Sequence, residues 1–245
     1  MGGDGVTTML WLDSVDKSYG DLEVLRSVNL EIGAGVQCLV GRNGAGKTTL
    51  MRLGLGLTEP RAGTVRMFGY DPRLHPEVMA RVGILLEEDE LFDFLRPLEF
   101  LDYCAALYGL DAGKARTRAV DLLEAMEVPG SDRLCHQLST GNRRQLALAA
   151  ALLHEPELLI LDEPFNGLDP VAVARLCRML RNFAANGRGV LLSSHRLELV
   201  EEIADQVYFV ADCAVTLWSP ERVKAWYDEL RVVSAGEQPQ GELTA

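Results

Sequence analysis

The segment GRNGAGKT, at residues 41–48, constrains the fold of this chain more than any other part of the sequence. The apolar run VQCLV directly precedes it, and TLMRLGLGL, with the composition of a helix, follows it. A buried strand, a glycine-rich loop and a helix in this order bind phosphate, because glycine permits the tight turn and the helix directs its first N–H groups at the anion. This context predicts a phosphate-binding loop in an α/β protein and argues against a simple glycine turn.

The loop also predicts how a bound nucleotide is contacted. The backbone N–H groups from Gly44 to Thr48 converge on a β-phosphate. Lys47 reaches the β- and γ-phosphates, and the Thr48 hydroxyl binds Mg²⁺. The loop residues predicted to bind the nucleotide are Gly41, Arg42, Asn43, Gly44, Ala45, Gly46, Lys47, Thr48 and Thr49.

The segment LLILDEP, at residues 158–164, supplies two carboxylates. Its four apolar residues predict a buried strand, and Asp162 stands where that strand ends, in a position to hold Mg²⁺ and its water shell. Glu163 is one residue further on. It then points toward the γ-phosphate and can act as general base for an attacking water. Two solvated acids at a strand end are the alternative, which the phosphate loop upstream disfavours.

The remaining patterns divide the chain into a core and an insertion. An α/β pattern covers about residues 1–80 and 145–230. Between them, over about 81–144, FLDYCAALYGL and KARTRAVDLLEAMEV show the i, i+3, i+4 apolar spacing of helices. The polar residues 231–245 form a loose tail. We expect an α/β fold with a P-loop NTPase (RecA-like) core, an N-terminal antiparallel β subdomain and an inserted α-helical subdomain.

The composition of the chain restricts which kinds of partner it can bind and in which cellular compartment we expect it. The chain has 36 acidic and 24 basic residues, a formal net charge of −12, whereas nucleic-acid binding proteins present a basic face. Its five cysteines include no CxxC pair, which argues against a zinc site or a disulfide framework. No apolar stretch approaches the ~18 residues that cross a bilayer, and MGGDGVTTML lacks a secretory signal. We expect a cytoplasmic chain that reaches a membrane only through another protein.

The segment LSTGN, at residues 138–142, resembles the signature sequence, usually LSGGQ, of ATP-binding-cassette (ABC) ATPases. Other motifs follow in the family's order along nearly the whole chain. Tyr19 in KSYG stands at the adenine-stacking position, Asp169 in FNGLDP at the D-loop, and His195 in LLSSH at the switch histidine. The chain is therefore identified as a member of this family, with residues 1–230 as the ATPase domain and ATP as the nucleotide.

The resemblance implies a head-to-tail dimer of two cassettes, identical or different. Each ATP then lies between the phosphate loop of one cassette and the signature of the other. A helix starting near Asn142 directs its positive end at that phosphate. His195 contacts the γ-phosphate and responds to its loss. The signature residues expected to contact ATP in trans are Ser139, Thr140, Gly141 and Asn142.

Three positions depart from the family pattern. Glu87 stands at the Q-loop glutamine; its carboxylate can still bind Mg²⁺ and serve catalysis, but it loses the amide donors and adds negative charge. We therefore predict a stronger dependence of ATP binding on Mg²⁺, which Glu87→Gln would weaken. Thr140 replaces a glycine, so its backbone must have ordinary angles, and Asn142 is a shorter amide than glutamine. After His195, FVADCAVTLWSPERV lacks the family's basic-glycine turn, with no functional account from the sequence.

A membrane partner is implied by the residues that follow the Q-loop. Leu91, Phe92 and Phe94 precede a helix expected to begin at Pro97. In related transporters this region receives a helix from the membrane subunit; packing of the helical subdomain is the alternative. The implied partners are multi-span permease subunits at the cytoplasmic face of the membrane. In its LSTGN signature, its Glu87 and its short tail, the chain most resembles the ATPase subunits of exporters.

Two other functions are compatible with a nucleotide-binding cassette. A soluble ABC ATPase acting on nucleic acid or ribosomes usually has two cassettes or a long coiled-coil insertion, together with basic surfaces. A nucleotide-binding regulator without turnover would lack Glu163 or His195, and both are present. We therefore expect an ATP-hydrolysing exporter subunit without a nucleic-acid partner.

Overall fold

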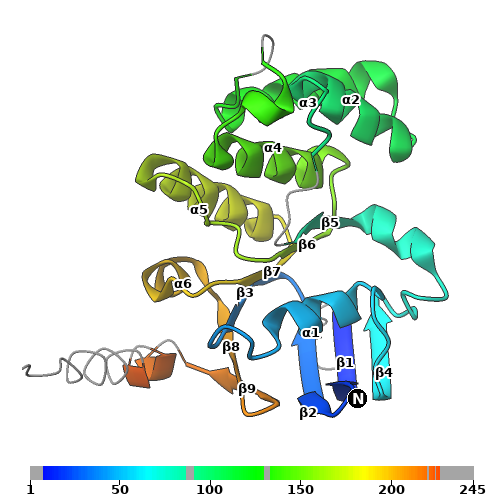
Figure 1. The fold of residues 1–245 in the computed structure, drawn as a ribbon, viewed down its shortest axis with the longest axis vertical. Helices are drawn as coiled ribbons and strands as arrows, with labels where there is room; N and C mark the ends of the chain where they lie inside the picture. Colours follow the sequence, from blue (N-terminus) through cyan, green and yellow to red (C-terminus); the bar gives the residue numbers. More distant parts are fainter. Residues whose placement is uncertain (1–7, 87–90, 130–132, 220, 224, 227–245) are drawn as a thin grey trace, which may run out of the picture.

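Two sheets and a group of helices make up the part of the chain that the computed structural model describes (Figure 1). The described residues are 8–86, 91–129, 133–219, 221–223 and 225–226. In Figure 1 an antiparallel sheet lies at the bottom, a mainly parallel sheet in the middle, and a helical segment at the top. This arrangement is the α/β core with a β subdomain and a helical insertion that the sequence predicts.

The antiparallel sheet is built from the N-terminal third of the chain. Its strands are Leu10–Tyr19 (β1), Leu22–Ile32 (β2) and Ala62–Met67 (β4), in the order β2-β1-β4. Leu10 and Leu12 of β1 are fully buried, whereas Trp11 between them is exposed. This alternation places one face of the sheet on the core and the other in water.

The second sheet has the order β5-β6-β7-β3-β8-β9. Its strands are Val82–Leu85 (β5), Leu158–Leu161 (β6), Gly189–Ser193 (β7), Gly35–Val40 (β3), Gln206–Ala211 (β8) and Ala214–Trp218 (β9). All pairings are parallel except that of β8 with β9. Strands β6 and β7 are buried along their whole length, as expected for parallel strands covered on both faces. Since these strands share a direction, the loops at their carboxyl ends meet at one edge.

Two apolar cores cover the two faces of this sheet. Successive residues of β3 face opposite cores: Leu39 packs with β1, β2 and the phosphate-loop helix, whereas Cys38 and Val40 pack with helices on the other side. The helices that flank the sheet are Lys47–Gly54 (α1), Pro170–Ala185 (α5) and Leu197–Ile203 (α6). The sheet is therefore packed on both faces, and this packing fixes the positions of the loops at the carboxyl ends of its parallel strands.

The helical segment lies beyond the β5 edge of the sheet (Figure 1). Its helix α2 begins at Pro97, as predicted, and the Asp111 carboxylate caps α3 by accepting from the N–H of Lys114 at 2.9 Å. The helices are Pro97–Leu107 (α2), Ala112–Ala125 (α3) and Thr140–Leu153 (α4), with a 3₁₀ turn at Cys135–Gln137 (η2). A separate 3₁₀ turn, Pro76–Arg81 (η1), directly precedes β5 and packs on the core of the antiparallel sheet. Within the described residues, none of the helices combines the length and apolar character needed to span a bilayer.

The structure corrects the predicted limits of this segment. Strand β5 pairs with β6, so residues 82–85 belong to the core and not to the insertion predicted over 81–144. Four apolar residues give too short a run for periodicity to distinguish a strand from a helix. Helix α4 crosses the limit at 144 and starts at Thr140, near Asn142 as expected. Ser139 Oγ accepts from the Asn142 N–H at 3.2 Å and caps the helix.

Candidate functional site

The phosphate loop connects the end of β3 at Val40 to the start of α1 at Lys47. Gly44 and Gly46 have φ angles of 80° and 106°, which side chains rarely allow. Gly41 has a different reason to be glycine: a Cβ placed there would lie 2.3 Å from the carbonyl oxygen of Val210 on β8. The loop therefore depends on glycine both for its turns and for its fit against the neighbouring strand.

Lys47 and Thr48 occupy the first turn of α1. The Lys47 side chain is buried, and its Nζ donates to the carbonyl oxygens of Gly41 and Arg42 at 2.8 and 3.2 Å. Thr48 Oγ1 donates to Asp162 Oδ2 at 2.6 Å, across 114 residues of sequence. The structure thus brings together the hydroxyl and the carboxylate that the sequence assigns to Mg²⁺.

Ser193 organises the two carboxylates, and we did not predict this role from the sequence. Its hydroxyl donates to Asp162 Oδ1 and accepts from the Glu163 N–H at 2.8 Å. Ser193 is fully buried at the end of β7, which lies between β6 and β3. A polar residue that ends an apolar strand, in GVLLSSH, is the signal that could have identified it.

Glu163 and His195 form a pair at the same edge of the sheet. His195 Nδ1 lies 2.9 Å from Glu163 Oε2, and the Glu163 side chain is mostly buried, with a relative exposure of 14%. Glu163 also has a φ of 47°, in the left-handed region that disfavours residues with a Cβ. Such a conformation persists only where the surrounding structure holds it, and it is common at active sites.

The phosphate loop, the first turn of α1 and the carboxylates of Asp162 and Glu163 surround a cavity of about 420 Å³. Tyr19, the predicted adenine-stacking residue, lies at its edge with a relative exposure of 47%, and Lys17 Nζ lies 4.8 Å from the centre of its ring. Val24, which the sequence did not indicate, adds an apolar wall. The lining residues are Tyr19, Val24, Asn43, Gly44, Gly46, Lys47, Thr48, Thr49, Asp162 and Glu163. The cavity is thus lined by the positive charge of Lys47, by two acidic side chains and by an exposed aromatic ring.

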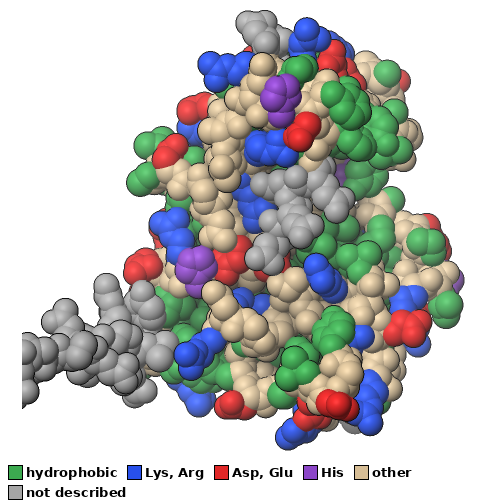
Figure 2. Space-filling view, in the orientation of Figure 1, with side chains coloured by type: hydrophobic (Ala, Val, Ile, Leu, Met, Phe, Trp, Pro, Cys, Tyr) green, Lys and Arg blue, Asp and Glu red, His purple; other side chains and the backbone are tan. Residues whose placement is uncertain are grey.

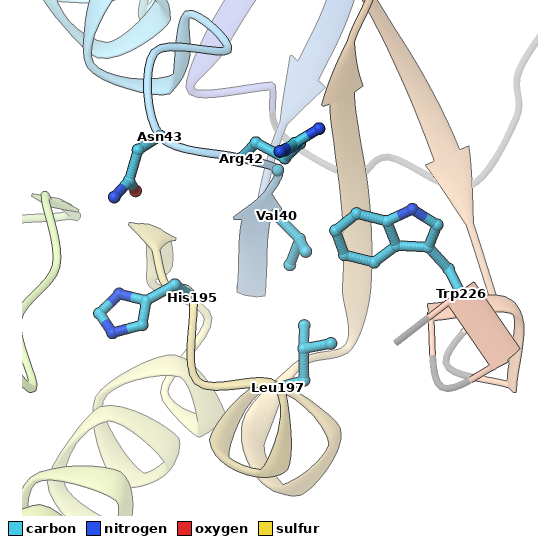
Figure 3. A pocket seen from close by; sticks show the side chains of 7 residues that line it. Val40, Arg42, Asn43, His195, Leu197 and Trp226 are labelled. Atoms are coloured by element: carbon cyan, nitrogen blue, oxygen red, sulfur yellow. The ribbon is translucent and has the colours of Figure 1, made fainter. Parts of the chain in front are cut away.

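A second cavity, of about 460 Å³, lies beside the first (Figure 3). Asn43 lines both cavities, whereas Gly41, Arg42 and His195 line only the second. Figure 3 shows Trp226 approaching Val40 and Leu197, with His195 across the space. The Trp226 ring packs on Phe209 of β8, with ring centres 4.7 Å apart. The C-terminal part of the described chain therefore lines the same cavity as the base of the phosphate loop.

The signature residues Ser139, Thr140, Gly141 and Asn142 lie at the N-terminus of α4 and do not line the first cavity. Thr140 has an ordinary helical backbone, as predicted. A Cβ on Gly141 would lie 2.9 Å from the carbonyl oxygen of Gly167 in the segment FNGLDP. Within one chain, the signature and this segment are therefore in close contact.

Asp169, predicted as a D-loop residue, caps helix α5. Its Oδ1 accepts from the N–H groups of Val171 and Ala172 at 2.8 and 2.9 Å. A carboxylate at this position also interacts favourably with the helix dipole. Asp169 thus shapes the loop between Glu163 and α5 from within its own chain.

The predicted docking residues form part of an aromatic cluster. Phe92 lies 5.8 Å from Phe94 and 5.1 Å from Tyr103 between ring centres, and all three are exposed. Leu91 is partly buried and packs on the main core. Figure 2 shows hydrophobic side chains gathered over the α2 end of this face, while basic and acidic side chains are interspersed elsewhere on it. Phe92 and Phe94 are therefore available to a partner, whereas Leu91 mainly packs internally.

Two predicted features lie outside the described residues: Glu87 and the tail 231–245.

The structure explains why the segment after His195 lacks the basic-glycine turn of the family. Strands β8 and β9 form a hairpin whose turn residues, Asp212 and Cys213, have φ angles of 50° and 61°. Two consecutive positive φ angles are typical of a type I′ turn, which makes the tight connection without the expected glycine.

Comparison with known proteins identifies the family to which this arrangement belongs. A family model described as "ABC transporter" matches residues 25–166. The chain belongs to the ABC transporter family. The family expected from the sequence is thereby confirmed. A solved structure described as an ATP-binding subunit of an ABC transporter aligns with a TM-score of 0.83 and 29% identity, covering 92% of this chain and 98% of that one. This chain is thus an ATP-binding cassette with the P-loop NTPase fold.

Sequence relatives of this cassette come from several bacteria. It is 38% identical to the bacitracin transport ATP-binding protein BcrA of Enterococcus faecalis, over 80% of this chain and 64% of BcrA. It is also 38% identical to the daunorubicin resistance ATP-binding protein DrrA3 of Streptomyces coeruleorubidus, over 83% of this chain and 65% of DrrA3. The alignments therefore span slightly less than two thirds of each of these relatives.

Proposed function

We propose that this chain is the ATP-hydrolysing subunit of an ABC exporter that drives separate membrane subunits. The observation that carries the proposal is the convergence of Lys47, Thr48, Asp162 and Glu163 on one cavity. This set combines a phosphate-binding cation, a pair of oxygen donors and a general base. The names of relatives, which include bacitracin transport, daunorubicin resistance and Nod factor export, support the exporter class.

The oxygen donors of the site fit Mg²⁺. Thr48 Oγ1 and Asp162 Oδ2 are hard oxygen atoms 2.6 Å apart, beside the lysine that would hold the phosphates. When bound, Mg²⁺ would neutralise charge on the β- and γ-phosphate oxygens. The Ser193 hydroxyl keeps the Asp162 carboxylate turned toward Thr48. The two donors are therefore already oriented for the ion.

The proposed hydrolysis uses Glu163 as general base. Its carboxylate accepts a proton from a water that attacks the γ-phosphorus, while Lys47 stabilises negative charge on the phosphate. His195 is hydrogen-bonded to Glu163 through Nδ1, which leaves Nε2 free to contact the γ-phosphate. The bond from γ-phosphorus to the bridging oxygen breaks, which gives ADP and phosphate.

A second cassette, identical or different, completes the proposed site. Ser139, Thr140, Gly141 and Asn142 lie outside this chain's own cavity but at the positive end of α4. There they can contact the ATP of a partner in trans. ATP then stabilises the closed dimer because it contacts both chains, and hydrolysis removes those contacts.

The proposed membrane partner is a multi-span permease subunit that contacts Phe92 and Phe94, with Leu91 behind them. Phe94 has a relative exposure of 72%, unusual for a phenylalanine that serves only to fill a core. A chain held in this way would be peripheral at the cytoplasmic face of the membrane. Rotation of the cassettes on closure would then be transmitted to the permease.

The test uses Glu163→Gln, which should bind ATP without hydrolysing it. The tagged variant would be purified with Mg-ATP from detergent-solubilised native membranes, and the copurified chains identified by mass spectrometry. We expect a multi-span membrane protein in fixed ratio, and its loss on adding Phe94→Ser. Recovery only from the soluble fraction, with ribosomal proteins or nucleic acid, would refute the exporter function in favour of a soluble ABC ATPase.

A further inference from the structure

Arg144 lies in the second turn of α4 and is almost completely buried, with a relative exposure of 4%. Arg144 is not among the residues that line the nucleotide cavity. Instead, Nη2 donates to the carbonyl oxygens of Asp162 and Glu163 at 2.6 and 2.9 Å, and Nη1 donates to that of Leu86 at 3.2 Å. One buried side chain thus joins α4 to the main chain of Asp162 and Glu163 and to the residue that follows β5.

These contacts bear on the unusual backbone of Glu163. A residue with a Cβ at a φ of 47° stays there only if hydrogen bonds and packing hold its two peptide groups. The Ser193 hydroxyl holds the N–H of Glu163, and Arg144 holds its carbonyl oxygen. Charge-assisted hydrogen bonds from a guanidinium to several acceptors are strong and directional, especially when buried. Arg144 is therefore placed to fix the direction in which the Glu163 side chain leaves the backbone.

The same helix carries the signature. Ser139 caps α4, and Arg144 follows it by five residues on a rigid helix. The helix that carries the signature is therefore hydrogen-bonded, through Arg144, to the carbonyl oxygens of Asp162 and Glu163.

We propose that Arg144 is a positioning residue that orients the general base Glu163 and couples it to the signature on α4. The inference rests on the proposed ATP hydrolysis. When the signature of one cassette binds the ATP of its partner, Arg144 carries the resulting shift of α4 to that cassette's own Glu163. Each chain thereby aligns its own base in response to the nucleotide held by the other chain.

The test compares Arg144→Lys with a matched control. Lysine keeps the positive charge but cannot donate in a planar fork to three carbonyl oxygens. The control is Arg118→Lys, because Arg118 also donates to main-chain carbonyls, those of Leu152 and Leu153 at 2.9 Å, at the other end of α4. Phosphate release would be measured against ATP concentration for the full-length chain, with thermal unfolding as the check on folding.

We expect Arg144→Lys to lower kcat about ten- to a hundredfold, as misplacement of a catalytic group by about 1 Å does, with KM for ATP within about twofold of wild type. Arg118→Lys should keep the wild-type kcat. The neutral Arg144→Gln provides a second test and should show the same split between kcat and KM.

A folded Arg144→Lys variant with kcat within twofold of wild type would overturn the positioning role. An equal loss in the Arg118→Lys control, or a failure of both Arg144 variants to fold, would overturn it as well, since Arg144 would then serve the fold alone. A wild-type chain that releases no phosphate would refute the proposed function and the positioning role together. The failure of the two proposals is therefore distinguishable.

Discussion

The imidazole of His195 and the carboxylate of Glu163 are joined by a hydrogen bond, with Nδ1 and Oε2 2.9 Å apart. Glu163 comes from the end of β6 and His195 from the loop between β7 and α6. With the imidazole Nδ1–H donating to the carboxylate oxygen, this contact orients the His195 ring toward Glu163. The proposed base and the proposed switch histidine are therefore linked within one chain.

Glu163→Gln should remove hydrolysis while leaving ATP binding intact. The amide cannot accept the proton of an attacking water, and loss of a general base lowers kcat by about 10²–10⁴-fold. Phosphate release and the binding of a fluorescent ATP analogue would be measured on the same preparation. Retention of more than a tenth of the wild-type kcat would show that another group acts as the base.

Lys47→Ala should weaken ATP binding at least tenfold. The side chain is buried, donates to the carbonyl oxygens of the loop, and lines the cavity beside Thr48 and Asp162. Lys114→Ala, on exposed helix α3, removes the same charge far from the cavity and serves as the control. We expect at least a tenfold loss of affinity for Lys47→Ala only, from loss of about 1.4 kcal/mol or more of binding free energy. Equal losses in both variants would point to net charge, not to the site.

Trp226 should report nucleotide binding through its fluorescence. Its ring lines the cavity that also contains Arg42 and Asn43, so rearrangement of the phosphate loop changes its surroundings. We expect ATP to change the emission of the wild-type chain and Trp226→Phe to lose that change. Trp11→Phe, on the antiparallel sheet, should retain it. A signal that disappears with Trp11 instead would place the rearrangement in the β subdomain.

His154 should make the folded state less stable in acid. Burial lowers the pKa of His154 below its ordinary value of 6.5. The hydrogen bond to the Val82 carbonyl oxygen raises this pKa, and repulsion from Arg118 lowers it further. Its ring stacks on Tyr108 at 3.9 Å, and its Nδ1 has no hydrogen-bond partner among the described residues. Because the unfolded chain binds a proton more readily, stability falls as the pH drops below 6.5.

Urea unfolding at pH 7.5 and pH 5.5 would measure this effect in wild type and in His154→Gln. Glutamine can still donate to Val82 but does not titrate. We expect the advantage of wild type over the variant to shrink at the lower pH. His75→Gln, at an exposed histidine, controls for general acid effects. An advantage that is the same at both pH values would contradict the prediction.

Local patterns predicted the parts of the site that depend on neighbouring residues in the sequence. The glycine loop, the end of LLILDEP and the helix at Pro97 each carry their own signal, and the structure places them as expected. Contacts between distant segments carry no such signal. The roles of Ser193, Arg144 and Val24 arise only when strands and helices pack together, and β5 became recognisable only through its pairing with β6.

The position of β7 between β6 and β3 has a consequence for the synthesis of the protein. The ribosome makes β3 and the phosphate loop well before β6 and Asp162. Strands β3 and β6 are not neighbours in the sheet, because β7 lies between them. They can align only after Gly189–Ser193 has left the exit tunnel and entered between them. A nascent chain that already contains both nucleotide-binding motifs therefore still lacks a working ATP site. The growing polypeptide gains that site only once β7 has been made.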